Sequence, residues 1–359
     1  MIGADWIMPK NKRMKALVKT AKGDGLVELR DVPVPEIGAG EVLIEVKAAG
    51  ICGTDLHIFH DAFPYWPPVI LGHEFSGVIA AKGPDVRGWE VGDRVVGEPH
   101  TLACGSCWLC RTGNRQICPS KRSPGWGIDG CFARYMRFPE PALLHRIPDD
   151  MPFDEAAFVE PAANVVRDVL ERGRVEPADT VVVIGPGPIG LMAAMAAKAG
   201  GAARVGLAGT DADEGLRLSL ARTNAVIDDV WNVQQEDVPA AVEALTGGRG
   251  ADLVVEASGS EGGIGLAARL VRKMGRVTAI GLTGRPEVRF PYGAMMSKAA
   301  DWIFNMSTSY TSWDRAIHLI HSGRIDVRPL LTHAGGLERW AEFFADLESK
   351  KGIKGIFLP

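Results

Sequence analysis

The sequence lacks several features that mark large classes of proteins. No stretch of its 359 residues approaches the roughly 18 uninterrupted apolar residues that a membrane-spanning helix needs. Its N-terminus has no apolar core followed by a small-residue cleavage site, so it does not indicate a secretory signal. Neither sign of charge dominates, because the net charge is -4 and the pI is about 6.1. We therefore expect a cytoplasmic protein that binds neither membranes nor nucleic acid.

Cysteine is missing from the second half of the chain, and all six cysteines lie before residue 132. Four of them form a C-x2-C-x2-C-x7-C pattern: Cys104, Cys107, Cys110 and Cys118. Because disulfides are rare in a reducing cytosol, metal binding is the leading interpretation. Four thiolates so close suit a closed, structural zinc site, and Cys118-Pro119 keeps an iron–sulfur cluster open as an alternative. The odd cysteine, Cys131, is expected to be a small buried residue.

A second group of metal-ligand residue types lies in residues 50–74, GICGTDLHIFHDAFPYWPPVILGHE. It contains Cys52, His57, His73 and Glu74. A thiolate, an imidazole and a carboxylate can bind zinc and leave one coordination position open for water or substrate. A buried cysteine with ordinary surface histidines is the alternative.

A glycine-rich loop lies in residues 181–191, VVVIGPGPIGL. It places G-x-G-x-x-G after a strand-like run and before a helical one, which is typical of dinucleotide binding. Gly185 permits the tight turn, Gly187 lets the backbone approach a pyrophosphate, and Gly190 allows close helix packing. The helix start at Pro188 and Ile189 would direct free amides at the phosphates.

The cofactor preference is open at the end of the next expected strand, residues 204–208. An acidic residue that holds the adenosine ribose is expected there, but the sequence has Gly209, followed by Thr210 and Asp211. A glycine would not repel the 2′-phosphate of NADP, and Thr210 and Arg217 could bind it. Asp211 and Asp213 argue for NAD, since they could bind the ribose hydroxyls or repel a phosphate.

The chain changes character near Pro161. Short β-rich runs separated by turn residues come first, at residues 16–18, 26–29, 42–46, 77–81 and 94–97, and predict an antiparallel, barrel-like domain. From Thr180 onward, strand-like runs alternate with helical segments, which predicts β-α-β units and a parallel sheet. Residues 312–322 and 337–350 predict two amphipathic helices before an apolar β tail, GIKGIFLP.

Taken in order, these motifs resemble the zinc-dependent medium-chain dehydrogenase/reductase superfamily, and within it the sorbitol (polyol) and threonine dehydrogenase branch. The matching segments are residues 50–57, 72–74, 91–95, 127–135, 159–161 and 185–190, together with the four cysteines. The resemblance implies an α/β protein with two domains and an active site in the cleft. A GroES-like, β-rich catalytic domain would comprise residues 1–163 and 301–359, and a Rossmann domain with a doubly wound parallel sheet would comprise residues 164–300. It also favours a homodimer or homotetramer.

The resemblance implies roles for individual residues. Cys52 and His73 would be ligands of a catalytic zinc ion, and Glu74 would bind the metal or lie directly behind it. Glu160 resembles the carboxylate that replaces a cysteine ligand in this branch. Thr54 and His57 resemble a relay that passes the alcohol proton to solvent, which suits a hydroxyl and an imidazole. Asp55 would orient the ligand histidine.

We therefore expect a zinc-dependent, NAD(P)-linked oxidoreductase with one catalytic and one structural zinc per chain. Its small-molecule substrate would be a secondary alcohol, a polyol or sugar alcohol, converted to the ketone by hydride transfer. L-Threonine 3-dehydrogenase is an alternative, although no single arginine can be assigned to a substrate carboxylate. The other alternative is a non-catalytic, zinc-stabilised relative.

The roles of two further residues are open. His100 is either a substrate contact or an exposed polar residue. Trp66 either shapes the mouth of the substrate pocket or packs against its neighbours.

Overall fold

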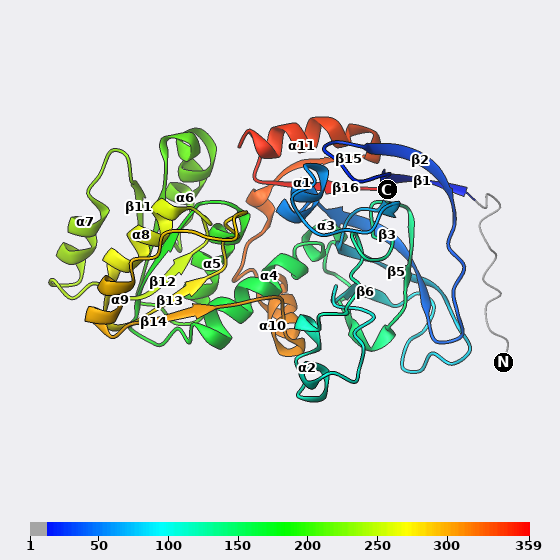
Figure 1. Cartoon of the computed structure of the whole chain (residues 1–359), viewed down its shortest axis with the longest axis horizontal. Coiled ribbons are helices and arrows are strands. Elements are labelled where there is room, and N and C mark those ends of the chain that lie inside the picture. Colours follow the sequence, from blue (N-terminus) through cyan, green and yellow to red (C-terminus); the bar gives the residue numbers. More distant parts are fainter. Residues whose placement is uncertain (1–12) are drawn as a thin grey trace. The chain divides into compact units, whose positions relative to one another are not determined.

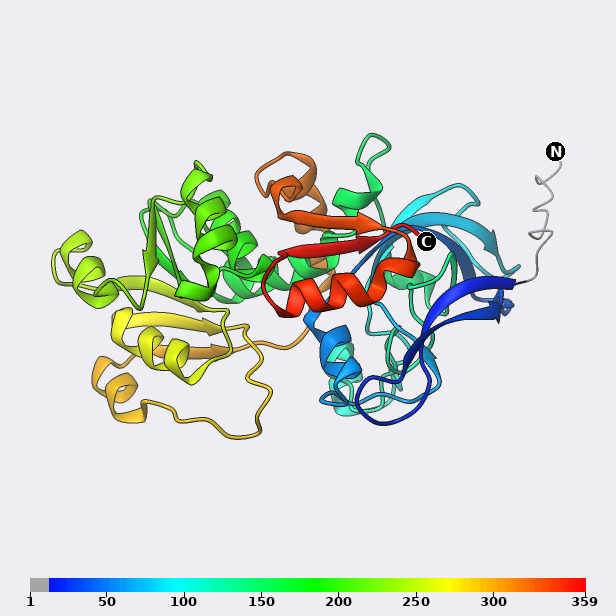
Figure 2. The ribbon, with the colours of Figure 1, turned by 90° about the horizontal axis from the view of Figure 1, so that it is seen from above.

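A computed structural model describes residues 13–359 of the chain. The chain forms two compact units, drawn in Figure 1 and, from above, in Figure 2. Unit 1 reaches as far as Glu160 and includes Leu331–Ser349 and Lys354–Pro359; unit 2 comprises Pro161–Leu330 and Lys350–Ile353. The domain boundaries at 163/164 and 300/301 stay a prediction. No helix in the described residues is both long and apolar enough to cross a membrane.

Unit 1 is built on antiparallel strands around β3, whose residues are nearly all buried. β3 pairs with β5, β7 and β16, so the last strand of the chain completes a sheet begun near its start. One sheet has the order β15-β16-β3-β5-β6-β8, and a second has the order β2-β1-β4. The strands are β1 Arg13–Lys19, β2 Val27–Pro33, β3 Val42–Gly50, β4 Val69–Ile70, β5 Glu74–Lys82, β6 Arg94–Gly97, β7 Tyr135–Phe138, β8 Leu144–Arg146, β15 Leu331–Gly335 and β16 Lys354–Phe357.

The helices of unit 1 are short, and α1 follows β3 directly after Cys52. Its α-helices are α1 Gly53–Phe59, α2 Trp108–Arg111, α3 Phe153–Ala156 and α11 Trp340–Glu348, and its 3₁₀ turns are η1 Arg115–Ile117, η2 Pro141–Leu143 and η7 Leu337–Arg339. Helix α4, Val159–Val166, begins in unit 1 and continues into unit 2.

Unit 2 contains a six-stranded sheet in which every pairing is parallel. Its order, β11-β10-β9-β12-β13-β14, is the doubly wound order of dinucleotide-binding folds, so the predicted fold class is confirmed. Such a sheet binds ligands at the carboxyl ends of its strands, where the strand order reverses, here between β9 and β12. The strands are β9 Thr180–Ile184, β10 Arg204–Gly209, β11 Asp229–Asn232, β12 Ala251–Glu256, β13 Val271–Ala279 and β14 Asp301–Phe304.

The helices of unit 2 follow its strands as the predicted β-α-β units require. The α-helices are α5 Pro188–Ala199, α6 Ser219–Thr223, α7 Val238–Leu245, α8 Glu261–Leu270, α9 Tyr292–Lys298 and α10 Tyr310–His321. The shorter turns are η3 Arg167–Arg172, η4 Asp211–Asp213, η5 Glu214–Leu218 and η6 Arg328–Leu330. The helix predicted near residues 214–223 is a π-helical turn, η5, followed directly by α6.

Candidate metal centres and dinucleotide site

The end of β3 and the start of β5 bring three candidate ligands together. One ligand atom from each of Cys52, His73 and Glu74 lies within 4.8 Å of the others. His73 and Glu74 are almost completely buried, and the ring of Trp126 packs edge-on against His73 with 4.9 Å between centroids. His73 Nδ1 is buried and has no hydrogen-bond partner among the described residues. This nitrogen lies beside Asp55, 3.9 Å from Oδ1, so the metal site is indicated by the three converging ligand atoms themselves.

Lys354 is a member of this site that sequence reasoning missed. Its Nζ is buried, donates to the carboxylate of Glu74, and lies 2.9 Å from the carbonyl oxygen of Ile51. A side chain at Gly50 would displace this pair, because a Cβ there would lie 2.2 Å from Glu74 Oε2. The only sequence signal was a single lysine in an otherwise apolar β tail.

Glu160 lies near the three ligands but outside their compact set. It is 8% exposed, in the first turn of α4, and its charge helps to raise the pKa values of His73 and Lys354. The compact set therefore includes Glu74 and not Glu160, and Glu160 lies within electrostatic reach of His73.

The electrostatics of the site favour a bound cation. Burial alone would lower the pKa of His73, but Cys52, Asp55 and Glu160 outweigh burial and raise it to about 10. The carboxylates gathered here at low exposure repel one another, and a divalent cation offsets that repulsion. The donors are the sulfur, nitrogen and oxygen types that zinc accepts.

The two residues predicted to form a proton relay, Thr54 and His57, both lie in helix α1. Thr54 and His57 are three residues apart on one helix, hence on the same face, and both are partly exposed. Neither side chain has a hydrogen-bond partner among the described residues, so both are free to bond substrate or water.

Asp55 orients the ligands through the backbone. Its carboxylate accepts hydrogen bonds from the Cys52 N–H at 2.9 Å and the Gly72 N–H at 3.1 Å. The distance from Asp55 Oδ1 to His73 Nδ1 is 3.9 Å, which is too long for a hydrogen bond. Asp55 therefore fixes the chain beside each ligand and does not bond the ligand ring itself.

The four predicted cysteines converge in the loop around α2. Their sulfur atoms lie within 4.8 Å of one another, with Cys118 Sγ 3.6 Å from Cys104 Sγ and 3.9 Å from Cys107 Sγ. Sulfur atoms about 2.3 Å from a tetrahedral zinc ion are separated by about 3.8 Å, so the spacing fits. The N–H groups of Cys107 and Ser106 lower the pKa of Cys104 to about 6, which favours its thiolate. Cys131 is fully buried, as expected.

The predicted dinucleotide loop lines a hollow of about 500 Å³ in unit 2. Gly185 has φ +101°, and a Cβ on Gly190 would lie 1.8 Å from the Gly185 oxygen, so only glycine fits at position 190. Gly185, Gly187, Gly209, Thr210 and Arg217 are among the lining residues. Pro188 and Ile189 form the first turn of α5, behind Gly187 as its N-cap.

The structure separates Asp211 from Asp213, which the sequence offered together as contacts of a cofactor ribose. Asp211 does not line the hollow; its Oδ1 accepts hydrogen bonds from Asn232 and Gln235 at 2.7 and 2.8 Å. Asp213 does line it, but lies 3.1 Å from Lys350 Nζ and 3.6 Å from Arg217 Nη1. Lys350 is a lining residue that sequence reasoning missed.

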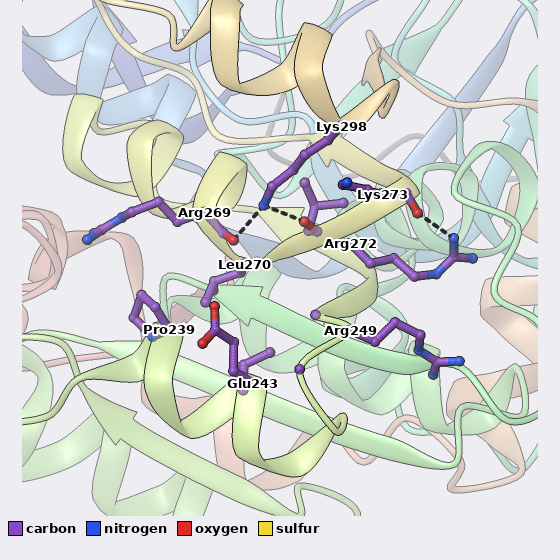
Figure 3. A pocket seen from close by; sticks show the side chains of 12 residues that line it. Pro239, Glu243, Arg249, Arg269, Leu270, Arg272, Lys273 and Lys298 are labelled. Carbon is purple, nitrogen blue, oxygen red and sulfur yellow. Dashed lines mark hydrogen bonds between the residues drawn. The ribbon is translucent and has the colours of Figure 1, made fainter.

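A second hollow in unit 2, of about 490 Å³, is lined by cations whose contacts are structural (Figure 3). Lys298 Nζ donates to the carbonyls of Ala268, Arg269 and Val271 at 2.6 to 2.8 Å and so caps the C-terminal end of α8. Arg272 Nε donates to Asp252 at 2.6 Å. These charges stabilise the fold, and the hollow contains none of the predicted site residues.

His100 is buried and paired, so the expectation of an exposed polar residue is wrong. Its Nε2 lies 2.7 Å from Glu98 Oε2, and Nε2 of His145 lies 2.9 Å from Glu98 Oε1. All three side chains are at most 4% exposed. Burial would raise the pKa of Glu98, but the hydrogen bonds to His100 and His145 outweigh burial and lower it.

Comparison with known proteins gives matches along nearly the whole chain. The family model of the alcohol dehydrogenase GroES-like domain matches residues 38–149, and that of zinc-binding dehydrogenases matches residues 188–322. A sorbitol dehydrogenase of Halalkalibacterium halodurans is 34% identical, over 96% of this chain and 99% of that protein. A D-arabitol-phosphate dehydrogenase of Enterococcus avium is 33% identical, over 96% of this chain and 97% of that protein. An L-threonine 3-dehydrogenase of Bacillus subtilis is 37% identical, over 97% and 99%.

A solved structure is similar throughout. The crystal structure of a zinc-binding dehydrogenase from Sinorhizobium meliloti 1021 bound to NADP has a TM-score of 0.89 and 28% identity. The similarity covers 97% of this chain and 100% of that one.

Proposed function

Because the chain belongs to the zinc-dependent medium-chain dehydrogenase/reductase superfamily, we propose that it oxidises a secondary hydroxyl of a polyol to the ketone, reversibly. The observation that carries this proposal is the convergence of half-buried Cys52 with buried His73 and Glu74, beside the free side chains of Thr54 and His57. A non-catalytic protein would have no need for a relay beside a ligand set. The relatives named for sorbitol and D-arabitol phosphate support a polyol.

The residues divide the chemistry between them. Cys52 and His73, with Glu74 or Glu160, would hold a zinc ion, which when bound makes a coordinated hydroxyl more acidic, while NAD(P) accepts hydride. Thr54 would accept the hydroxyl proton and donate its own, and His57 would release that proton to solvent. Asp55 would keep the ligand loops in place. Cys104, Cys107, Cys110 and Cys118 would hold the structural zinc.

We also propose that NADP is preferred over NAD. Arg217, Lys350 and Arg269 line the cofactor hollow, and among residues 13–359 the one carboxylate that lines it is Asp213, already beside two of these cations. The remaining positive charge suits the 2′-phosphate of NADP, and Gly209 offers no carboxylate to repel it. Asp211, the other acid in this region, bonds to amides and does not line the hollow.

The ratio of kcat/KM with NADP to that with NAD tests this preference. We expect Lys350→Gln to lower the ratio about tenfold to a hundredfold, the value of one or two charge-assisted contacts. The matched control is Lys351→Gln, because Lys351 is exposed and does not line the hollow. A wild-type preference for NAD would contradict the proposal.

A second candidate function is L-threonine 3-dehydrogenase, which the relative from Bacillus subtilis favours. A panel of polyols, phosphorylated polyols, simple secondary alcohols and L-threonine, followed by nicotinamide absorbance, decides between the two. Failure of the wild-type protein to oxidise any of them with either cofactor would refute the dehydrogenase proposal.

For assembly, we propose a homodimer or homotetramer. β14 is the edge strand of the parallel sheet, and apolar side chains near it are exposed: Leu282, Phe304 and Met306 at 58%, 69% and 60%. An apolar edge strand favours pairing with a second copy. Light scattering after Phe304→Asp tests this, and an unchanged mass would contradict it.

We also propose a cytoplasmic location, since the convergent free thiols suit a reducing compartment.

A further inference from the structure

An arginine without a carboxylate partner lies beside the aromatic residues around the ligand set. The guanidinium carbon of Arg122 lies 4.0 Å from the ring centroid of Trp66. Its Nη1 donates to the carbonyls of Ser120 and Lys121, at 3.5 and 3.1 Å. No acidic side chain in the described part of the chain forms an ion pair with Arg122. Its other guanidinium donors are therefore available to an anionic ligand.

The backbone around Arg122 holds it in place. Its N–H donates to the Thr101 carbonyl at 3.1 Å, and the Thr101 hydroxyl donates to the Arg122 carbonyl at 2.6 Å. The side chain packs against Gly127, where a Cβ would lie 2.9 Å from Arg122 Cδ. An arginine held by Thr101, Gly127 and Trp66 loses less conformational freedom on binding a ligand than an arginine surrounded by solvent.

A short path connects Arg122 with the candidate metal ligands. The Trp66 N–H donates to the Trp126 carbonyl at 2.9 Å, and the Trp126 ring lies 4.9 Å from that of His73. Two tryptophan residues thus connect the ligand histidine with the arginine. Trp66 is 47% exposed, so one part of this aromatic surface faces solvent.

Classes of anionic substrate differ in how many bonds lie between the carbinol carbon and the anion. An extended carbon chain advances about 1.2 Å per bond. The carboxylate of threonine is two bonds from its carbinol carbon, whereas the terminal phosphate of a pentitol or hexitol is several bonds further away. A phosphate, like a carboxylate, accepts two parallel hydrogen bonds from the planar guanidinium group.

We propose that Arg122, stacked on Trp66, binds the terminal phosphate of a phosphorylated polyol whose secondary hydroxyl reaches the Cys52, His73 and Glu74 set. This inference rests on the proposed dehydrogenase function and narrows its substrate class. Lys121 precedes Arg122 in the chain, but its Nζ donates to the Gln116 carbonyl at 2.6 Å, so the phosphate contact is assigned to Arg122 alone. Trp66 holds the guanidinium plane by a cation–π contact.

The test compares kcat/KM for each polyol with and without its terminal phosphate: D-arabitol and D-arabitol 5-phosphate, sorbitol and sorbitol 6-phosphate. We expect the wild-type, zinc-loaded enzyme to prefer the phosphate ester at least about tenfold. Arg122→Leu should lower this preference about tenfold to a hundredfold, mainly through KM, and Arg122→Lys should retain part of it. Arg111→Leu is the matched control, since Arg111 is an exposed arginine of the same loop.

Several outcomes would overturn the proposal. Equal wild-type rates with the neutral polyol and its phosphate ester would show that no phosphate site exists. An equal loss on both substrates in Arg122→Leu would assign Arg122 a structural role. L-Threonine oxidised more efficiently than every phosphate ester would point to a carboxylate site. In each of these outcomes the wild-type protein is still an active dehydrogenase. The dehydrogenase proposal itself fails only if the wild-type protein oxidises no substrate of the panel.

Discussion

Breaking the buried pair of Lys354 and Glu74 gives the sharpest test of how this site is held together. Replacing Lys354 with methionine removes the ammonium group and keeps a side chain of similar length. The lysine is 4% exposed and the glutamate 1%, so water cannot take over the lost contact. Burial would lower the pKa of Lys354, but Glu74 and Cys52 outweigh burial and raise it, so the lysine is charged.

The expected cost follows from the uncompensated charge. Removing one partner of a buried ion pair typically destabilises a protein by about 3 to 5 kcal/mol. The hydrogen bond from Lys354 Nζ to the Ile51 carbonyl is lost as well. For a unit of about 150 to 250 residues, each kcal/mol lowers Tm by about 2 to 4 °C, so Lys354→Met should lower it by about 6 to 20 °C.

Thermal unfolding of the zinc-loaded protein measures this loss. The matched control is the double variant Lys354→Met with Glu74→Gln, which removes both charges. The double variant leaves no unpaired charge at this buried position, so it should be more stable than Lys354→Met alone. The reasoning is refuted if Lys354→Met melts within about 1 °C of the wild type, or if the double variant is the less stable of the two.

Three further predictions concern other parts of unit 1. Gly50→Ala should cost about 1 to 3 kcal/mol in urea unfolding, because its Cβ overlaps Glu74 Oε2, whereas Gly53→Ala, with open space around its Cβ, should cost nothing. Cys52→Ser should abolish turnover and leave the fold intact, whereas the main effect of Cys107→Ser should be a lower Tm. Metal analysis that finds one zinc per chain, retained in Cys52→Ser, would contradict the assignment of one catalytic and one structural zinc. Because the pKa of Glu98 is lowered in the folded protein, its charge contributes stability that is present above pH about 4.5 and lost as pH falls below it. The Tm of the wild type should therefore exceed that of Glu98→Gln by less at about pH 3.5 than at pH 6. A Tm difference that stays constant over this range would contradict this.

The parallel sheet and the four-cysteine loop were predictable because short-range sequence determines both. The glycine loop needs only a strand, a tight turn and a helix in succession, and residues 181–191 contain all three. The four cysteines lie within 15 residues, so one loop can bring their sulfur atoms together. The helical and strand-like periodicities of unit 2 likewise reflect neighbours in sequence.

The charge balance of each site could not be predicted in this way. Sequence pattern could not show whether Asp211 or Asp213 faces the cofactor, because the answer depends on Asn232, Gln235 and Lys350, which come from other elements. It also left open whether Glu74 or Glu160 lies closer to Cys52 and His73.

The sequence by itself determined the residue types of this protein's chemistry: a thiolate, an imidazole and carboxylates for zinc, four cysteines in one loop, and a dinucleotide turn. Only the tertiary structure decided what surrounds them. Lys354 donates a hydrogen bond to Glu74, which lies 280 positions earlier in the chain, and Arg122 stacks on Trp66. The physical reason is that a motif acts through neighbours a few residues away, whereas a buried charge depends on whichever distant segment the fold brings against it.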